Sequence, residues 1–190
     1  METARLILRP WQPEDAQPFA HMNADPRVME YLPARLDREQ SDALMNRIIA
    51  HFETHGFGLW VVETKYTGDF AGCVGLLNVP GVLPFAPALE LAWRLDPAHW
   101  GRGYATEAAR YCLDFAFTRM AADRVVAYTV PANKASWRVM ERIGLVRDAG
   151  GDFDHPALPV GHRLRRHVLY RLARADWRAD VRPRQGLQES

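Results

Sequence analysis

The chain has 190 residues, of which 48% are hydrophobic and 25% charged, and this length suits one domain with a sizeable core better than two domains. The formal net charge at pH 7 is +1, so no overall positive field would recruit nucleic acid or an anionic membrane surface. No charged and then apolar leader opens the chain, and no apolar run approaches the roughly 18 residues that a membrane span needs, which predicts a cytoplasmic protein without a membrane partner.

The first part of the chain indicates one strand and two helices. Residues 4–9 alternate between apolar and polar side chains, as a half-buried strand does. A short helix that Asp15 caps is predicted to run through Asn23. A longer helix should follow the capping box that Asp37 and Gln40 can form, and it should end at Gly56.

Three strands are predicted next. Residues 57–65 and 70–79 are rich in β-branched and aromatic side chains, and the polar turn between them indicates a hairpin. Residues 80–87 contain three prolines and a glycine, which indicates a loop. The apolar run 89–95 that follows is the central strand of the prediction.

Residues 89–117 read LELAWRLDPAHWGRGYATEAARYCLDFAF, which indicates a strand, a loop of small residues and a helix. In the loop, Gly101 and Gly103 lack the Cβ atoms that would keep a ligand away from the backbone, and the first-turn N–H groups of the helix stay free. Those donors and the positive end of the helix dipole suit a pyrophosphate. A tight turn without a ligand is the alternative interpretation of the same pattern.

The rest of the chain predicts a strand over residues 124–130, a helix that Asn133 caps and Gly144 ends, and two further strands, 145–146 and 162–172. No internal repeat and no linker is found. We therefore expect an α/β (α+β) fold.

Residues 1–180 are expected to form one domain and residues 181–190 a frayed tail. Cys73 and Cys112 lie in apolar runs, which indicates buried free thiols.

Three motifs in a fixed order carry a resemblance to a known family. They are residues 3–9 (TARLILR) with 25–29 (DPRVM), residues 100–108 (WGRGYATEA), and residues 133–136 (NKAS) with 143–145 (IGL). The second motif resembles the Gln/Arg-x-x-Gly-x-Gly/Ala signature with which the GNAT superfamily of N-acetyltransferases holds acetyl-CoA. Trp100 replaces the usual Gln or Arg, as in the branch that is similar to RimJ and RimL, the ribosomal-protein N-terminal acetyltransferases.

The resemblance implies the GNAT acyl-CoA N-acyltransferase fold, a mixed twisted sheet of about seven strands with helices on both faces. It implies acetyl-CoA as the co-substrate and an amine as the acceptor. In this family the central strand splays from its neighbour, and the pantetheine arm bonds to free main-chain groups there. The residues implied to hold acetyl-CoA are Ala92, Trp93, Arg94, Leu95, Trp100, Gly101, Arg102, Gly103, Tyr104, Ala105, Thr106, Asn133 and Ser136.

Glu90 is the candidate general base. In a strand its side chain shares a face with Arg94. A free α-amino group has a pKa of about 7.7–8.0, so a carboxylate that reaches it directly or through water would assist attack. Glu90 could instead pair with Arg94 or with a neighbouring strand. Asp154 and His155 are rival bases in the polar segment 150–159, which is also a good turn.

The proton donor is less obvious. Many family members place a tyrosine four residues before the glycine that ends the last motif, and this chain has Met140 there, which cannot donate a proton. The resemblance places Ser136 near the CoA sulfur and Asn133 on the pantetheine, although helix capping and a first-turn polar position would also explain them. A non-catalytic acyl-CoA-binding or sensing module therefore stays open as an alternative to an enzyme.

Tyr31, Trp60 and Phe85 lie in segments that would border the acceptor site in this fold, and they are candidate acceptor contacts. The seven histidines are scattered, so no metal is expected. Eight arginines between Arg163 and Arg184 concentrate charge near the end of the chain, where a solvated strand and tail is expected rather than an RNA contact. The identity of the amine and a homodimer are left open.

Overall fold

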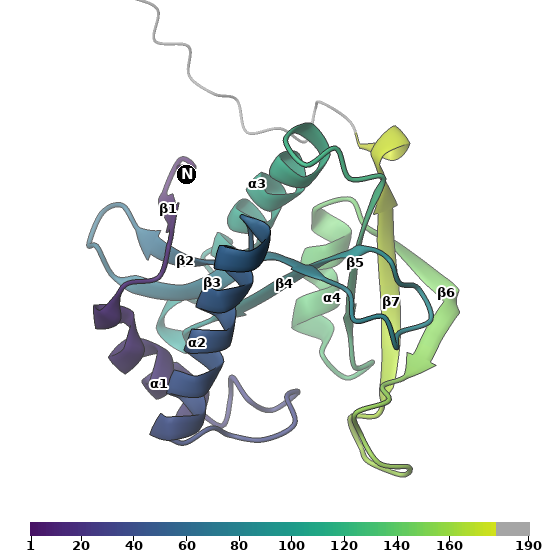
Figure 1. Cartoon of the computed structure of the whole chain (residues 1–190), viewed down its shortest axis with the longest axis horizontal. Helices are drawn as coiled ribbons and strands as arrows, with labels where there is room; N and C mark the ends of the chain where they lie inside the picture. Colours follow the sequence, from purple (N-terminus) through teal and green to yellow (C-terminus); the bar gives the residue numbers. More distant parts are fainter. Residues whose placement is uncertain (178–190) are drawn as a thin grey trace, which may run out of the picture.

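The computed structural model describes residues 1–177, and the predicted tail over residues 181–190 lies outside this range. The described residues form a seven-stranded sheet in the order β1-β2-β3-β4-β5-β7-β6 (Figure 1). Every neighbouring pair is antiparallel except β4 and β5, which are parallel. The mixed sheet of the sequence prediction is confirmed.

The elements follow the predicted order. The strands are β1 (Leu6–Arg9), β2 (Leu59–Thr64), β3 (Phe70–Asn78), β4 (Leu89–Leu95), β5 (Arg124–Thr129), β6 (Val146–Asp154) and β7 (Arg166–Ala173). The helices are α1 (Ala16–Ala24), α2 (Arg38–His55), α3 (Tyr104–Thr118) and α4 (Lys134–Arg142). Short 3-10 turns are η1 (Pro13–Asp15), η2 (Pro97–His99) and η3 (Arg174–Asp176).

Helices cover both faces of the sheet. On one face Leu91 of β4 packs in a buried cluster with Leu113 of α3 and Met140 of α4. On the other face Phe19 of α1 and Ile48 of α2 pack against Cys73 of β3. Because successive strand residues point to opposite faces, β4 presents one set of side chains to α3 and the alternate set to the opposite face.

The loop between β3 and β4 covers a third region of the sheet. Val79 and Leu83 are buried there against Val126 of β5, Phe153 of β6 and Leu169 of β7. This proline-rich segment therefore buries the apolar side chains of β5–β7, as α1 and α2 bury those of β3.

The central strand β4 parts from β5. It pairs with β3 along its whole length, from Asn78↔Leu89 to Gly72↔Leu95. With β5 it pairs only at Leu89↔Val125 and Glu90↔Val126. Figure 1 shows the two strands separating beyond this point. Residues 91–95 therefore keep one main-chain edge without a strand partner, as the family resemblance implied.

Of the two predicted N-terminal caps in the first part of the chain, the structure confirms the cap of α2 but not that of α1. Asp37 and Gln40 form the predicted capping box, since each backbone N–H donates to the other side chain, and Gly56 ends α2 with φ 74°. The predicted cap of α1 is wrong, because the Asp15 side chain accepts no bond from the first turn of that helix; its capping bond, from the Gln12 amide at 2.8 Å, belongs to η1. The buried Asp15 carboxylate also accepts two 2.8 Å bonds from the Arg9 guanidinium, which offsets the cost of burying the charge.

The predicted turn over residues 150–159 is wrong in its first half. β6 continues to Asp154 alongside β7, and the pairing register shifts between Asp148 and Phe153. Gly150 and Gly151 fall within that shift, where extra unpaired residues bend a strand and glycine costs least. The connecting loop is left with residues 155–165, and β7 begins at Arg166 rather than at His162.

Both cysteines are free and buried, as predicted, and burial raises the pKa of the Cys73 thiol to about 11. Over residues 1–177 no helix has both the length and the apolar character to cross a bilayer.

Candidate functional site

The glycine loop between η2 and α3 presents open backbone. Gly101 and Gly103 have φ of 74° and 78°, a left-handed conformation that other residues adopt only with strain. A Cβ added at Gly101 would meet nothing within 4 Å, and one at Gly103 would meet only Nη2 of Arg5, at 3.5 Å. Side chains therefore do not fill the loop.

The main-chain N–H groups of residues 101–106 donate to no acceptor within the described part of the chain. Three of them belong to the first turn of α3, whose amides have no partner inside the helix. Free amides and the positive end of a 15-residue helix together make a site for an anionic group.

The segment just before β1 fixes the start of α3 through Glu107. The Glu107 carboxylate accepts hydrogen bonds from Thr3 Oγ1 (2.6 Å), the Arg5 amide (2.9 Å) and Arg5 Nε (2.7 Å). Arg5 also donates to the Arg102 carbonyl at 2.9 Å, and its guanidinium lies 4.9 Å from the centroid of the Tyr104 ring. Burial would raise the pKa of Glu107, but the bonds from Thr3 and Arg5 outweigh it and hold the pKa below the usual value.

We expect Glu107→Ala to lower the free energy of unfolding by about 2–3 kcal/mol, because several hydrogen bonds to one carboxylate are lost together. Acetyl-CoA should also bind more weakly, since the start of α3 loses its anchor to Thr3 and Arg5. Denaturant unfolding and calorimetry measure the two effects. Glu39→Ala, in the first turn of α2, is the control, and equal losses in both variants would contradict the anchoring role.

Trp100 ties the loop to the end of the central strand. Its indole Nε1 donates to the main-chain carbonyl of Leu95 at 2.8 Å, and 46% of the residue is exposed. The residue that departs from the usual motif thus holds the loop against β4. Within residues 92–95, the carbonyl of Leu95 therefore already accepts a hydrogen bond from the protein.

The side chains of β4 divide between the two faces. Trp93 and Leu95 pack against the cluster that contains α3. By strand alternation Glu90, Ala92 and Arg94 lie on the opposite face, beside the edge that β5 leaves unpaired.

Glu90 bonds to β5, not to Arg94. Its Oε2 accepts a 2.6 Å hydrogen bond from the hydroxyl of Tyr128, a residue that the sequence analysis did not name. Burial raises the pKa of Glu90, and the bond from Tyr128 lowers it in part. Burial and the neighbouring Glu90 charge raise the pKa of Tyr128. The carboxylate is therefore a stronger base than an exposed glutamate.

Aromatic rings and histidines surround Tyr128. Its ring centroid lies 5.6 Å from Phe85, 5.4 Å from Phe153 and 5.8 Å from His167. His155 lies 5.2 Å from His167, and burial lowers the pKa of both imidazoles, which favours their neutral forms at pH 7.

The rival base Asp154 lies apart from this group of rings. It pairs with Arg165 and Arg166 at the end of β6. Of the two rivals to Glu90, only His155 therefore lies in the Tyr128 cluster.

Arg94 reaches toward α1. Its Nη1 donates to Oδ1 of Asn23 at 2.5 Å, and Asn23 Nδ2 donates to Ser41 Oγ at 2.8 Å. Burial lowers the pKa of Arg94. The family motif points to Arg94 only for its main chain, and strand alternation points to it as a possible partner of Glu90, but a charged side chain in a central strand is itself a signal of a site.

Asn133 caps α4, the alternative that the sequence left open. Its Oδ1 accepts from the Ser136 amide at 3.2 Å, and its Nδ2 donates to Thr129 Oγ1 at 3.1 Å. The Ser136 hydroxyl is half-buried and has no hydrogen-bond partner within residues 1–177. It is therefore free to meet a ligand.

The three candidate acceptor contacts, Tyr31, Trp60 and Phe85, do not lie together in the structure. Phe85 belongs to the cluster around Tyr128, and Tyr31 lies in the α1–α2 loop, whose Glu30 carbonyl accepts from Arg163 of the 155–165 loop at 2.9 Å. Trp60 is 6% exposed and packs between Phe52 and Phe115 in the cluster that contains α3. That face of the sheet is the one away from Glu90, so Trp60 does not belong with the other two.

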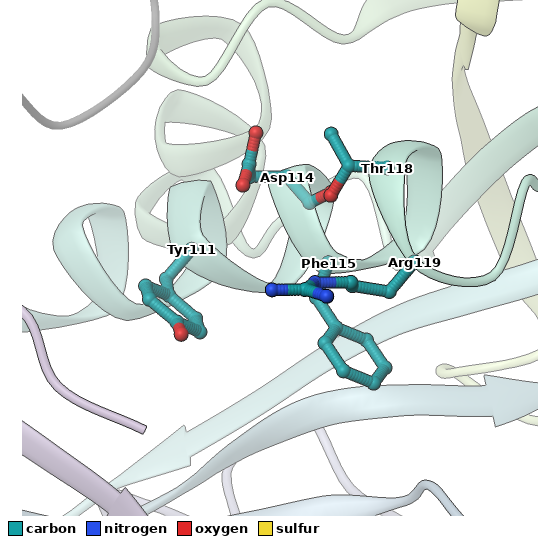
Figure 2. Close-up of a pocket in the computed structure, with 5 residues that line it drawn as sticks. All are labelled: Tyr111, Asp114, Phe115, Thr118 and Arg119. Atoms are coloured by element: carbon teal, nitrogen blue, oxygen red, sulfur yellow. The ribbon is translucent and has the colours of Figure 1, made fainter.

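A hollow of about 70 Å³ lies along the last turns of α3. Figure 2 shows its lining side chains leaving that stretch of the chain; they are Tyr111, Asp114, Phe115, Thr118 and Arg119. It is far smaller than the roughly 300–1,000 Å³ of ligand pockets and lies at the end of α3 away from the glycine loop. Over residues 1–177 no three His, Cys, Asp or Glu side chains are grouped as metal ligands.

The arginines near the end of the chain are mostly paired. Arg171 pairs with Asp148 and Arg174 with Asp123, in addition to the contacts of Arg163, Arg165 and Arg166 given above. The last three of the predicted run, Arg178, Arg182 and Arg184, lie outside the described residues.

Comparison with known proteins points to one family. The model of the family described as "Acetyltransferase (GNAT) domain" matches residues 5–146. This range contains the glycine loop, β4 with Glu90 and Arg94, and the start of α4.

Three similar proteins illustrate the comparison: one is uncharacterized, one is a named transacetylase, and one is a solved structure with a similar fold. The uncharacterized protein YkkB of Bacillus subtilis (strain 168) is 37% identical over 144 residues, which are 75% of this chain and 83% of that protein. The FsC-acetyl coenzyme A-N(2)-transacetylase of Aspergillus fumigatus is 30% identical over 186 residues, covering 93% of this chain and 77% of that protein. The solved structure of the ribosomal-protein-S5-alanine acetyltransferase of Vibrio fischeri has a TM-score of 0.72 at 21% identity, covering 94% of this chain and 98% of that one.

Proposed function

The chain belongs to the GNAT acetyltransferase family and is an acetyl-CoA-dependent N-acetyltransferase, and on that premise we propose which residues act and how. The acetyl group passes directly from the thioester to a primary amine while both are bound. The observation that carries this proposal is the conjunction of an open glycine loop at the start of α3 with a β4 edge that β5 leaves unpaired.

The donor half of the site is mainly backbone. The amides of residues 101–106, with Arg5 and Arg102 beside them, would hold the pyrophosphate. The pantetheine would extend along the unpaired edge of residues 92–95, where a main-chain N–H polarises the thioester carbonyl and stabilises the oxyanion. Asn133 caps α4 through Oδ1, and the second N–H of its Nδ2, beside the one donated to Thr129, would bond the pantetheine.

Glu90 is the proposed base. The amine loses its proton to the Glu90 carboxylate, directly or through a water, as its nitrogen attacks the thioester carbonyl. The tetrahedral intermediate then breaks its C–S bond, and the acetyl group stays on nitrogen. The raised pKa of Glu90 suits it to accept a proton near neutral pH.

Ser136 is the proposed relay of a proton to the departing thiolate, its hydroxyl taking a proton from water as it gives its own to sulfur, because Met140 is buried, 1% exposed, and has no proton to give. The hydroxyl of Ser136 is unpartnered on the first turn of α4. We expect Ser136→Ala to lower kcat about tenfold while the acetyl-CoA dissociation constant changes less than about twofold. Steady-state kinetics and calorimetry check this, and unchanged turnover would remove Ser136 from the mechanism.

The alternative, a module that binds acyl-CoA without turning it over, gives a different result in one experiment. Thiol release from acetyl-CoA is followed over a panel of primary amines with purified protein. We expect release that depends on the amine. Acetyl-CoA binding in calorimetry without release for any amine would support the sensing module, and no binding at all would contradict both readings.

The finer assignments are also proposals. The WGRGYATEA motif and the fold likeness to the Vibrio fischeri S5-alanine acetyltransferase support placement in the Rim-type branch. The acceptor would then be a protein N-terminus or a small-molecule amine. Tyr31 and Phe85 are the proposed aromatic contacts of that amine, the chain is proposed to act in the cytoplasm, and a homodimer is compatible with the proposal.

A further inference from the structure

Arg94 carries a charge with no counterion within residues 1–177. None of the ion pairs in this part of the chain includes it. Its one hydrogen bond runs from Nη1 to the neutral amide of Asn23. A guanidinium has five N–H donors, so most of its hydrogen-bonding capacity is unused.

The unused donors are not completely sealed from solvent. No nitrogen of Arg94 is both cut off from solvent and without a hydrogen-bond partner, whereas Nε of Arg110 is. The residue is nevertheless partly buried, so its charge has lost much of its hydration. A desolvated cation with open donors gains free energy when an anion reaches it.

Arg94 lies on the same face of β4 as Glu90, with only the methyl group of Ala92 between them. Four residues of strand separate their Cα atoms by about 13 Å, and the two side chains end at Tyr128 of β5 and at Asn23 of α1. The segment between Glu90 and Arg94 is the one along which the thioester is proposed to lie. An acceptor at that position would have its amine toward Glu90 and its other end toward Arg94.

We propose that the Arg94 guanidinium binds a carboxylate of the acceptor, so that the acceptor is an amino acid or another small molecule with both an amine and a carboxylate. With Nη1 held by Asn23, the Nε and Nη2 edge can bind two carboxylate oxygens side by side. A single cation matches the single negative charge of a carboxylate. The inference rests on the proposed function and names its substrate class.

A purely structural role for Arg94 predicts something different. Asn23 lies near the end of α1 and Ser41 near the start of α2, so Arg94 could simply brace the two helices. Loss of such a brace would lower stability and slow all acceptors alike. Discrimination between acceptors with and without a carboxylate separates the two roles.

The experiment compares the free amino acids with their C-terminal amides as acceptors, following CoA release. For the best acceptor we expect kcat/KM for the acid to exceed that for the amide about tenfold or more. Arg94→Gln should reduce this acid-to-amide ratio about tenfold, mainly through KM for the acid, and Arg94→Lys should retain part of it. Arg174→Gln, an exposed arginine paired with Asp123, is the matched control and should keep the ratio.

A ratio unchanged by Arg94→Gln, or a wild-type preference for amides, would overturn the inference. If Arg94→Gln fails to fold, the wild-type ratio and Arg94→Lys decide. Two further measurements distinguish failure of the carboxylate site from failure of the proposed function: calorimetry with acetyl-CoA, and turnover with spermidine, which has no carboxylate. Acetyl-CoA binding with turnover of spermidine but not of amino acids would reject only the carboxylate site, whereas no binding of acetyl-CoA would reject the proposed function.

Discussion

Gly103→Asp should abolish measurable acetyl-CoA binding, with an expected loss of affinity of about 100-fold or more. An aspartate side chain would start 3.5 Å from Nη2 of Arg5 and would place its carboxylate where the proposed pyrophosphate meets the free amides of α3. The negative charge would therefore occupy the anion site from within and repel the ligand. Calorimetry with acetyl-CoA measures the loss.

The strain of the substitution needs its own control, and the chain provides one. Gly68 has φ 71°, and a Cβ there would meet nothing within 4 Å, so Gly68→Asp imposes a similar backbone strain in the β2–β3 turn. We expect both variants to lose about 1–2 kcal/mol of stability and only Gly103→Asp to lose acetyl-CoA binding. Equal binding by Gly103→Asp and wild type would remove the glycine loop from the site.

Glu90→Gln should lower kcat by about 100-fold or more, because an amide cannot accept the proton of the attacking amine. The geometry should be preserved, since Gln can still accept the hydrogen bond from Tyr128. Glu141→Gln is the matched control: Glu141 also accepts a bond from a tyrosine hydroxyl, that of Tyr170 at 3.2 Å, but it lies on α4. Steady-state assays of CoA release compare kcat of the two variants with that of the wild type. A Glu90→Gln enzyme with wild-type kcat would exclude Glu90 as the base.

The pH profile gives an independent measure of the same residue. The base works when ionised, so kcat/KM should fall as pH falls through the pKa of Glu90, which burial places above the ordinary glutamate value of about 4.3. The bond from Tyr128 lowers that pKa, and Tyr128→Phe removes the bond. The acidic limb of the Tyr128→Phe profile should therefore move to higher pH, and a limb that stays in place or moves down would contradict the assignment.

Local patterns predicted much of this protein from its sequence. The bounds of β4, the capping box of Asp37 and Gln40, and the glycine loop before α3 all depend on residues within a few positions of each other. The order of the elements followed from the same short-range signals. Even so, the turn predicted over residues 150–159 was wrong, because pairing with β7 extended β6 through two glycines.

In the candidate site, too, local signals could be predicted from the sequence and contacts between distant segments could not. The sequence by itself determined that Glu90 lies in a strand, that a glycine loop precedes a long helix, and that Asn133 begins the next helix, because each depends on neighbouring residues. Only the tertiary structure decided that Glu90 meets Tyr128, 38 residues away, that Arg94 meets Asn23, 71 residues away, and that Trp60 faces the core. The separation of β4 from β5 is decided there as well, since strand pairing and the side chains that it brings together depend on contacts between segments that are distant along the chain.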